Sequence, residues 1–472
     1  MDFTEIAAAH RLRFSERNVH EEVIRGFLLQ LKQLHQGYSG KIPWRSIGEL
    51  GPDDAHDFSA LPESVPDSEA FFRELVIVKL NGGLGFSMGL DRAKSLLPVK
   101  EGLTFLNIII EQVKSLRVQT GREIPLLFMN SFKTREDTLI QDGVAALNGS
   151  APGDIPPDFL QNMIPRVYAD SLLPYGDGTD PDHWCPPGHG DVYISLLITD
   201  TLERLLAAGY RRLFISNCDN LGAQVNERIL EYIYAENLDF CIEITPKTLA
   251  DRKGGTFFRR LDENGKQGNI ELLERAQVAD EHVGEFEDIK RFKYFNINNL
   301  YVNIEALRDR LAHHDFDLSL IVNDKTLANG DKILQLETAM GSAIGNFPNA
   351  RAVVVDRDRF APVKTSNDLI VRRSDAYSLD RTDFSLRRNP DLVQEPLIHL
   401  DDRWYKNIGD FDSLVPSPPG LLECESLAVE GPVLFDKKIE IQGKVVIRAR
   451  GDSPRPISSL GKKTLKDETL EL

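Results

Sequence analysis

Cysteine is scarce in this chain of 472 residues, which contains only four. Cys185, Cys218, Cys241 and Cys424 are far apart and form no CxxC pair, so neither a disulfide-stapled secreted scaffold nor a cysteine-based zinc site is indicated. We expect buried, reduced thiols. Long apolar runs are also missing, since none reaches the roughly 18 residues that a membrane-spanning helix needs. No membrane partner is therefore expected.

The N-terminus lacks the apolar stretch of a signal peptide, and Asp2 and Glu5 do not suit a transit peptide. We therefore predict a cytoplasmic protein. Positive charge is also in deficit, because 73 Asp and Glu outnumber 56 Lys and Arg, for a formal net charge of −17. A nucleic-acid partner is not expected. A phosphorylated ligand would have to be held locally by lysines, backbone amides and a divalent cation.

The middle of the chain alternates apolar, β-branched runs with helical patterns. Before it come an amphipathic helical stretch at 21–36 and an acidic, proline-containing stretch at 51–69, which we expect to be a surface loop. Strands are predicted at 75–80, 124–129, 212–216 and 240–245, and helices at 105–116 and 192–208. This alternation predicts a mainly parallel, doubly wound α/β sheet. Ligands bind such sheets at the carboxyl ends of the strands.

The C-terminal part, from about residue 396, has a different texture. Short β-like pieces occur at 427–429, 433–435, 439–441 and 445–447, with glycines in between. Their spacing of about six residues suggests a small β-helix, with a plain sheet or barrel as the alternative. We expect the charged tail at 462–472 to fray. The chain is thus divided into a helical segment (1–70), an α/β domain (71–395) and a β-domain (396–472).

A glycine-rich segment, LNGGLG at 80–85, follows the first predicted strand and leads through Gly89 to Lys94. Glycines let the backbone approach a ligand closely, and their amides can surround an anion beside a helix start. The spacing matches neither GxGxxG nor GxxxxGK[ST]. A plain turn would also use glycines, but Lys94 adds the positive charge that a triphosphate requires.

Two further clusters also follow predicted strands. In WCPPGHGD at 184–191, the prolines fix the chain and the glycines open it, which leaves His189 on a loop tip. The alternative is a structural histidine in a turn. Asp219 follows the strand predicted at 212–216 and is well placed to bind Mg²⁺, which prefers carboxylate and phosphate oxygens. It could equally be a helix cap or turn former.

Several single residues are candidates of lower specificity. Lys247 and Lys364 lie in predicted loops and could contact phosphate as mobile point charges. Asn298 and Asn299 each offer a donor and an acceptor to sugar hydroxyls. Each of these residues alone could simply be solvated surface. Nothing in the pattern around Gln161 singles it out.

Taken together, these clusters resemble the eukaryotic-type UTP–glucose-1-phosphate uridylyltransferases, also called UDP-glucose pyrophosphorylases. Nine segments match in the family's order: LNGGLG (80–85), FMNSF (128–132), WCPPGHGD (184–191), SNCDNLGA (216–223), TPKTLADRKGG (245–255), AQVADEHVGEF (276–286), FNINNLYVN (295–303), QLETAMGSAI (335–344) and RFAPVKTSNDL (359–369). The chain departs from the family at Phe86, usually threonine, and at Arg92-Ala93, usually Gly-Pro. The spacing of Lys94 from the glycines is kept.

The resemblance implies a Rossmann-like nucleotide-diphosphosugar transferase core with a mixed, mainly parallel sheet, and a C-terminal left-handed β-helix. It assigns the catalytic roles to Lys94 and Lys364, and Mg²⁺ to Asp219. Residues implied to bind the nucleotide are Leu80, Asn81, Gly82, Gly83, Lys94, Gln161, Gly188 and Asp219. Those implied to bind the sugar phosphate are His189, Asn217, Cys218, Lys247, Asn298 and Lys364.

The implied reaction joins UTP and glucose 1-phosphate into UDP-glucose and pyrophosphate, with Mg²⁺ as cofactor. A related enzyme acting on N-acetylglucosamine 1-phosphate or on several sugar phosphates would share the fold and mechanism and differ only in the sugar pocket. A non-catalytic nucleotide-sugar sensor is the alternative from another class, and a glucosyltransferase that uses UDP-glucose is a weaker one. A homo-oligomer through the C-terminal domain is possible, but the sequence does not determine it.

Overall fold

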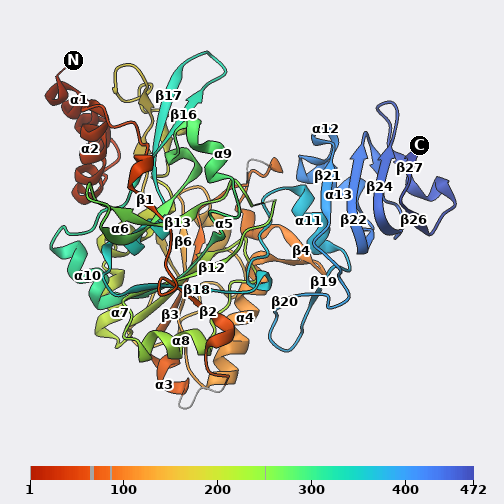
Figure 1. The fold of residues 1–472 in the computed structure, drawn as a ribbon, viewed down its shortest axis with the longest axis horizontal. Coiled ribbons are helices and arrows are strands. Elements are labelled where there is room, and N and C mark those ends of the chain that lie inside the picture. The colour runs from red at the N-terminus through yellow and green to blue at the C-terminus, as the bar shows by residue number, and fades with distance from the viewer. Residues whose placement is uncertain (1, 64–67, 86–87, 250) are drawn as a thin grey trace.

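The protein is described by a computed structural model that covers residues 2–63, 68–85, 88–249 and 251–472, so Phe86 lies outside the described residues (Figure 1). An eight-stranded sheet forms the centre, with strand order β2-β18-β12-β15-β11-β3-β6-β7. Its strands are β2 (Ala55–Asp57), β18 (Ala350–Val354), β12 (Phe240–Pro246), β15 (Tyr294–Asn303), β11 (Arg212–Asn217), β3 (Leu75–Asn81), β6 (Leu126–Asn130) and β7 (Asp158–Leu160). Only β15 runs antiparallel to its neighbours, which confirms a mixed, mainly parallel sheet.

Strand β3 shows how the sheet separates two apolar layers. Leu75 and Ile77 pack on one face with α4 (Phe105–Thr120) and α8 (Glu227–Ala235). Val76 and Val78 pack on the other face with α6 (Val192–Ile198), α7 (Thr201–Ala207) and α10 (Ile304–Ala312). Because side chains of a strand alternate between faces and both faces are covered, β3 is buried along its length.

Two expectations about the α/β part need correction. The helix predicted at 192–208 is two helices, α6 and α7, because Asp200 has a φ of 55°, a left-handed conformation that interrupts an α-helix. The stretch at 51–69 is not only a surface loop, since its strand β2 pairs in parallel with β18 and forms the edge of the central sheet. The four predicted strands and the helices at 21–36 and 105–116 are confirmed.

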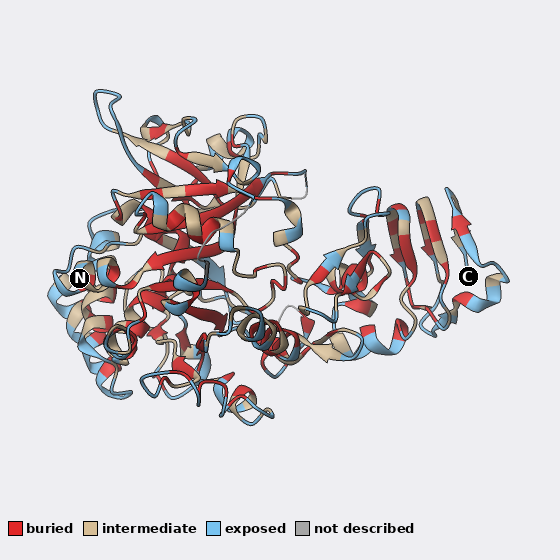
Figure 2. Ribbon diagram, turned by 90° about the horizontal axis from the view of Figure 1, so that it is seen from below, coloured by how far each residue is buried: buried red, intermediate tan, exposed pale blue. Residues whose placement is uncertain are grey.

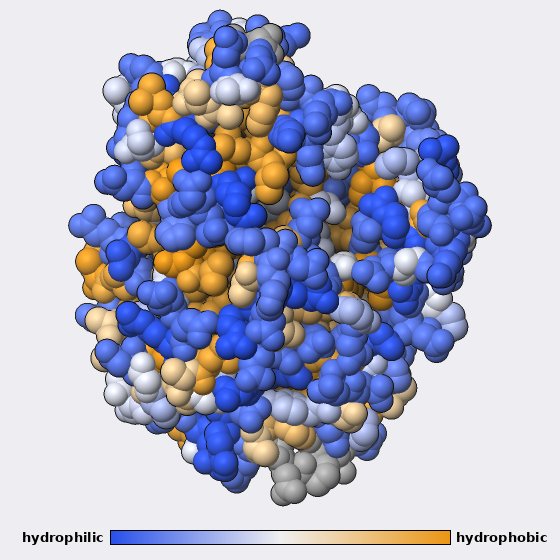
Figure 3. All heavy atoms as spheres, turned by 90° about the vertical axis from the view of Figure 1, so that its left-hand side faces the viewer, coloured by the Kyte–Doolittle hydropathy of each residue, from blue (hydrophilic) through white to orange (hydrophobic). Residues whose placement is uncertain are grey.

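The N-terminal residues form two helices, α1 (Phe3–Ser15) and α2 (Glu21–His35), of which only α2 was expected. Their apolar side chains pack with β8 (Ile164–Pro165), β10 (Trp184–Cys185) and the hairpin of β16 (Leu320–Thr326) and β17 (Lys332–Thr338). The outer face on this side of the molecule mixes polar and apolar surface (Figure 3). No helix of the described ranges is long and apolar enough to cross a membrane.

The C-terminal part consists of stacked parallel strands at the side of the α/β part (Figures 1 and 2). The strands β21 (Leu397–Leu400), β22 (Gly420–Glu430), β24 (Glu440–Arg448), β26 (Thr464–Lys466) and β27 (Thr469–Glu471) form one sheet. All of its pairs are parallel, whereas a meander of short hairpins would make antiparallel pairs. The tail does not fray as expected, because β26 and β27 both pair with β24.

The two parts share one apolar core. The cluster that contains α4 and α8 continues through α11 (Ser366–Arg373) to Leu427 and Val445 in the stacked strands. Buried residues recur along these strands (Figure 2). The division at residues 70 and 395 stays a prediction. All four cysteines are free and buried, as expected.

Smaller elements complete the fold. Strands β13 (Thr256–Leu261) and β14 (Gln267–Leu273) form a three-stranded sheet with β1 (Ile47–Gly48), and β9 (Val167–Tyr168) pairs with β17. The others are α3 (Ser68–Arg73), β4 (Pro98–Lys100), β5 (Leu103–Thr104), α5 (Arg135–Leu139), α9 (Val283–Phe286), β19 (Tyr377–Leu379), β20 (Leu386–Arg388), α12 (Asp402–Tyr405), α13 (Ile408–Leu414), β23 (Val433–Leu434) and β25 (Arg455–Pro456).

Candidate active site

Adjacent parallel strands bring two of the sequence clusters together. In the register of β3 and β11, Leu80 lies opposite Asn217, so the glycine segment and Asp219 leave the sheet side by side. The backbone amide of Cys218 donates to the carbonyl oxygen of Leu80 at 3.1 Å, which ties the two exits together. The carboxyl edge of the sheet is therefore where the candidate residues meet.

Asp219 lies between two lysines. Its Oδ2 is 2.8 Å from Lys94 Nζ and 4.0 Å from Lys364 Nζ. Desolvation alone would raise the pKa of Asp219, but the two ammonium groups outweigh it and hold the pKa below its usual range. The Lys364 side chain is 64% exposed, against 15% for Lys94, so Lys364 is the more accessible of the two. The group carries a net positive charge of one at neutral pH, which suits an incoming polyphosphate.

The glycine segment lies beside this charged group, and the lack of side chains at its glycines leaves space along its backbone. The amide of Lys94 donates to the carbonyl oxygen of Gly83 at 3.2 Å, so the loop closes back on itself. Among the residues that the structure describes, none places a heavy atom within 4 Å of a Cβ built at Gly83, so open space faces this position. A Cβ at Gly82 would come within 2.5 Å of Gln161 Oε1. A side chain at 82 would therefore displace Gln161.

Gln161 belongs to this side of the site although no sequence pattern pointed to it. It follows β7, and its backbone amide donates to Asn130 O at 2.7 Å, at the end of β6. Its side-chain Nε2 donates to Gly188 O at 2.9 Å. Gly188 has a φ of +82°, and a Cβ there would collide with the backbone of Thr338. The edge strand β7, which is only three residues long, is what brings Gln161 to the glycine segment.

His189 is held in one tautomer. Its Nδ1 accepts a hydrogen bond from the backbone amide of Met340 at 3.0 Å, so a neutral ring carries its proton on Nε2. Desolvation and the charge of Lys364 lower the pKa of His189 to about 4. At neutral pH the ring is therefore uncharged and offers one N–H donor.

Lys247, Asn298 and Glu274 are further polar residues to consider, and the charges of Lys247 and Lys364 both act on Glu274. Lys247, which follows β12, is buried and donates from Nζ to Gly254 O at 3.0 Å. Desolvation lowers its pKa to about 8, although Asp251, Glu274 and Glu287 act in the opposite direction. Asn298 has a left-handed φ of 58°, and its Oδ1 accepts from Asn296 Nδ2 at 2.9 Å.

Glu274 is a member of this group that sequence reasoning missed. Desolvation raises its pKa to about 7, with Lys247 and Lys364 lowering it in part. A Cβ at Gly255 would come within 2.5 Å of Glu274 Oε1, so the carboxyl group approaches the backbone there. The pair Gly254-Gly255 was the available signal, because adjacent glycines often mark a close approach to a neighbouring group.

Two candidates turn their side chains away from the open space. Asn81 is only 3% exposed, and its Nδ2 donates to Asn130 Oδ1 and Thr138 Oγ1, each at 2.8 Å. Cys218 is buried in an apolar cluster with Leu221, and burial raises the pKa of its thiol. Both residues lie at the site, but only their backbones are available to a ligand.

The site suits Mg²⁺ through one carboxylate, that of Asp219, and not through a preformed group of ligands. Among the residues that the structure describes, no group of three or more His, Cys, Asp or Glu could hold a metal by itself. Asp219 offers a single ionised carboxylate next to the open side of the glycine segment. Because Mg²⁺ is often bound by one or two carboxylates together with substrate phosphates, a preformed cage is not required.

Comparison with known proteins gives a family match over most of the chain. The family model described as UTP–glucose-1-phosphate uridylyltransferase matches residues 24–442. The chain is similar to the protein of that name from Pyrus pyrifolia, at 38% identity over 95% of this chain and 92% of the relative. It is similar to that from Saccharomyces cerevisiae at 38% identity over 86% and 80%. A variant UDP-glucose pyrophosphorylase from Leishmania major, solved with UDP-glucose, superimposes with a TM-score of 0.88 at 35% identity over 99% of both chains.

Proposed function

Because the chain belongs to the UTP–glucose-1-phosphate uridylyltransferase family, we propose that it joins UTP and glucose 1-phosphate into UDP-glucose and pyrophosphate. The observation that carries the proposal is the group of Lys94, Asp219 and Lys364 beside the open glycine segment. It concentrates the charges that two phosphorylated substrates require. The chain is thus a nucleotidyltransferase.

The reaction is a direct displacement at the α-phosphorus of UTP. A phosphate oxygen of glucose 1-phosphate forms the new O–P bond, and the bond to the bridging oxygen of the β-phosphate breaks, so that pyrophosphate leaves. The attacking oxygen is already an anion, so no general base is needed. The barrier comes mainly from bringing polyanions together and from charge spread over the phosphoryl oxygens. Lys94 and Lys364 offset that charge, and neutral His189 can donate one hydrogen bond from Nε2.

Asp219 is the residue that would hold Mg²⁺ together with substrate phosphates. When bound there, the ion would neutralise phosphate charge as a Lewis acid. The low pKa of Asp219 keeps the carboxylate ionised at neutral pH, which metal binding requires. In the structure, Lys94 Nζ lies 2.8 Å from Oδ2 of this carboxylate. Lys94 therefore contacts the residue that would hold the ion.

The substrates occupy different halves of the site. On the nucleotide side, Leu80, Gly82, Gly83 and Gly188 offer backbone and space, and the Gln161 amide is suited to a base edge. To the sugar side we assign Asn217, Lys247, Asn298 and Glu274, and the charges of Lys247 and Lys364 both act on Glu274. The carboxyl group of Glu274, with a pKa of about 7, can either accept from or donate to a sugar hydroxyl.

Three further features belong to the proposal. The parallel pairing of the stacked C-terminal strands supports a β-helix, for which we propose the left-handed form. The exposed end strand β26 leaves a sheet edge through which copies of the chain could associate. A cytoplasmic location is supported by the free, buried cysteines.

The decisive experiment measures pyrophosphate release from UTP or TTP with a panel of sugar 1-phosphates, with and without Mg²⁺. We expect release with UTP and glucose 1-phosphate in the presence of Mg²⁺. A higher kcat/KM with N-acetylglucosamine 1-phosphate would favour the related enzyme. Calorimetry that shows UDP-glucose binding without any turnover would favour the sensor.

A further inference from the structure

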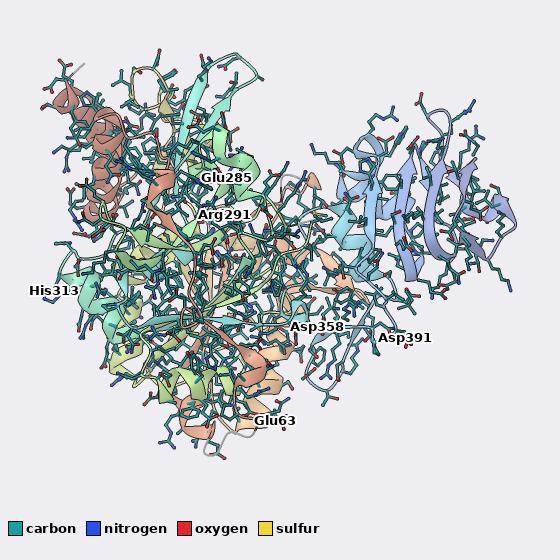
Figure 4. All side chains as sticks on the ribbon, in the orientation of Figure 1. Glu63, Glu285, Arg291, His313, Asp358 and Asp391 are labelled. Atoms are coloured by element: carbon teal, nitrogen blue, oxygen red, sulfur yellow. The ribbon has the colours of Figure 1, made fainter. Side chains whose placement is uncertain are left out.

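Asn220, which follows Asp219, connects two loops that are distant in sequence. It is 1% exposed, and its side chain uses both ends of the amide. Its Nδ2 donates to Arg359 O at 3.1 Å and to Asn299 Oδ1 at 3.4 Å. Its Oδ1 accepts from the amide of Ala361 at 2.9 Å. One buried side chain therefore joins the loop of Asp219 to the loop at 357–365, whose start is marked by Asp358 in Figure 4.

The backbones of the two loops are also joined. Asn220 forms an isolated antiparallel bridge with Pro362, and the amide of Val363 donates to Asp219 O at 3.3 Å. A Cβ at Gly222 would lie within 2.8 Å of the backbone carbon of Arg359. The loops therefore approach more closely than a residue with a side chain at 222 would allow.

A buried ion pair anchors this assembly to the central sheet. Arg359 Nε donates to Glu243 Oε2 at 2.7 Å, and Glu243 on β12 is fully buried. Asn299 Nδ2 donates to the same oxygen at 2.9 Å. Arg359 Nη2 also donates to Gln224 O at 2.6 Å, just beyond the loop of Asp219. A buried charge with several hydrogen-bonding partners holds its surroundings in a defined arrangement.

Lys364 directly follows the loop segment that Asn220 and Asp219 hold. Its backbone amide donates to Asp368 Oδ2 at 2.7 Å, in the N-terminal cap of α11. The backbone of Lys364 is therefore held between the Asn220 bridge on one side and a helix start on the other. Only the side chain extends from this fixed point toward Asp219.

We propose that Asn220 is a positioning residue that sets the distance between Asp219 and Lys364, and so places Lys364 for the reaction. The inference rests on the proposed role of Lys364. Asparagine suits the task because it donates and accepts at once. Alanine would do neither, and would leave the amide of Ala361 and the carbonyl of Arg359 without this partner. Small errors in the placement of a charged group lower the rate even when both substrates still bind.

A double-mutant cycle on kcat tests the proposal. We expect Asn220→Ala to lower kcat about tenfold with KM for UTP nearly unchanged, because the Asn220 side chain bonds the loop that carries Lys364. In a Lys364→Ala background the same substitution should change kcat by less than about twofold, because residues that act through one another are not additive. Equal losses in both backgrounds, or no loss in either, would overturn the proposal.

Two further variants keep the result interpretable. Asn220→Ser, which retains a hydroxyl, should give an intermediate loss and replaces Asn220→Ala in the cycle if the alanine variant does not fold. Asn148→Ala is the matched control, because Asn148 is also buried and bonds both backbone groups of Leu126, away from Lys364. It should lower the melting temperature but change kcat less than about twofold. Near-normal turnover of Lys364→Ala alone would contradict the role of Lys364 itself.

Discussion

The two proposed halves of the site, one for the nucleotide and one for the sugar phosphate, are built differently. The nucleotide half consists mainly of glycines and backbone, as Gly82 and Gly188 show, because close approach leaves no room for a Cβ. The sugar half consists of partly or fully buried ionisable side chains, such as Lys247 and Glu274, whose pKa values desolvation has moved to about 8 and about 7. The nucleotide half should therefore respond to added volume, and the sugar half to charge and pH.

Where the halves meet, both depend on the same charges. Lys94 extends from the nucleotide half and Lys364 from the sugar half, and both reach Asp219. We expect Lys94→Ala and Lys364→Ala each to lower kcat by more than about tenfold, with circular dichroism unchanged. Steady-state pyrophosphate release measures the effect. If either variant kept near-normal turnover, the charge of that lysine would not be needed for the reaction, and the two halves would not depend on it together.

Asp219→Asn tests the proposed metal contact at the same junction. The amide keeps the shape but removes the anionic charge, so the Mg²⁺ concentration for half-maximal activity should rise several-fold. A Mg²⁺ titration at saturating substrates measures it. A titration curve that coincides with that of the unchanged protein would exclude Asp219 as the ligand.

Gly82→Ala probes the volume sensitivity of the nucleotide half. The new methyl group would meet Gln161 Oε1 at 2.5 Å and push the amide from its place. We expect KM for UTP to rise about fivefold with a smaller change in KM for glucose 1-phosphate, since only one half is disturbed. Gly26→Ala on α2 is the control, because a Cβ there meets nothing within 4 Å. Equal changes in both KM values would contradict a separation into halves.

The difference between the halves also explains what could be predicted from the sequence. Glycines, a lone aspartate after a strand and prolines around His189 leave local patterns, from which the proposed nucleotide half could be predicted. The mainly parallel sheet was predicted correctly. Glu274 was missed because its raised pKa arises from burial in the folded chain, which the local sequence pattern does not show. The local pattern does not show the place of Gln161 either, because its position depends on the short edge strand β7.

Errors in the fold also arose from contacts that are distant in sequence. The tail at 462–472 reads as charged and mobile, but parallel pairing with β24 orders it. The strand β2 lies in a proline-containing stretch and is fixed by β18, almost 300 positions later. Local propensity cannot supply such partners, whereas the helix at 21–36 carries its own apolar face and was predicted correctly.

Glu274→Gln should give the smallest effect and tests the charge sensitivity of the sugar half. The raised pKa means that folding favours the protonated carboxyl, so this group's contribution to stability is full below its unfolded pKa, near 4.5, and is lost as the pH rises through about 7. Glutamine stays neutral, so the variant should gain melting temperature relative to the unchanged protein between pH 5 and pH 8, by about 2 °C at pH 8. Differential scanning calorimetry across that range measures the gain. Between pH 6 and pH 8, the KM for glucose 1-phosphate should vary less with pH in the variant than in the unchanged protein. The pH dependence of the KM for UTP should be the same in both. A melting-temperature difference independent of pH would mean that Glu274 does not titrate in this window.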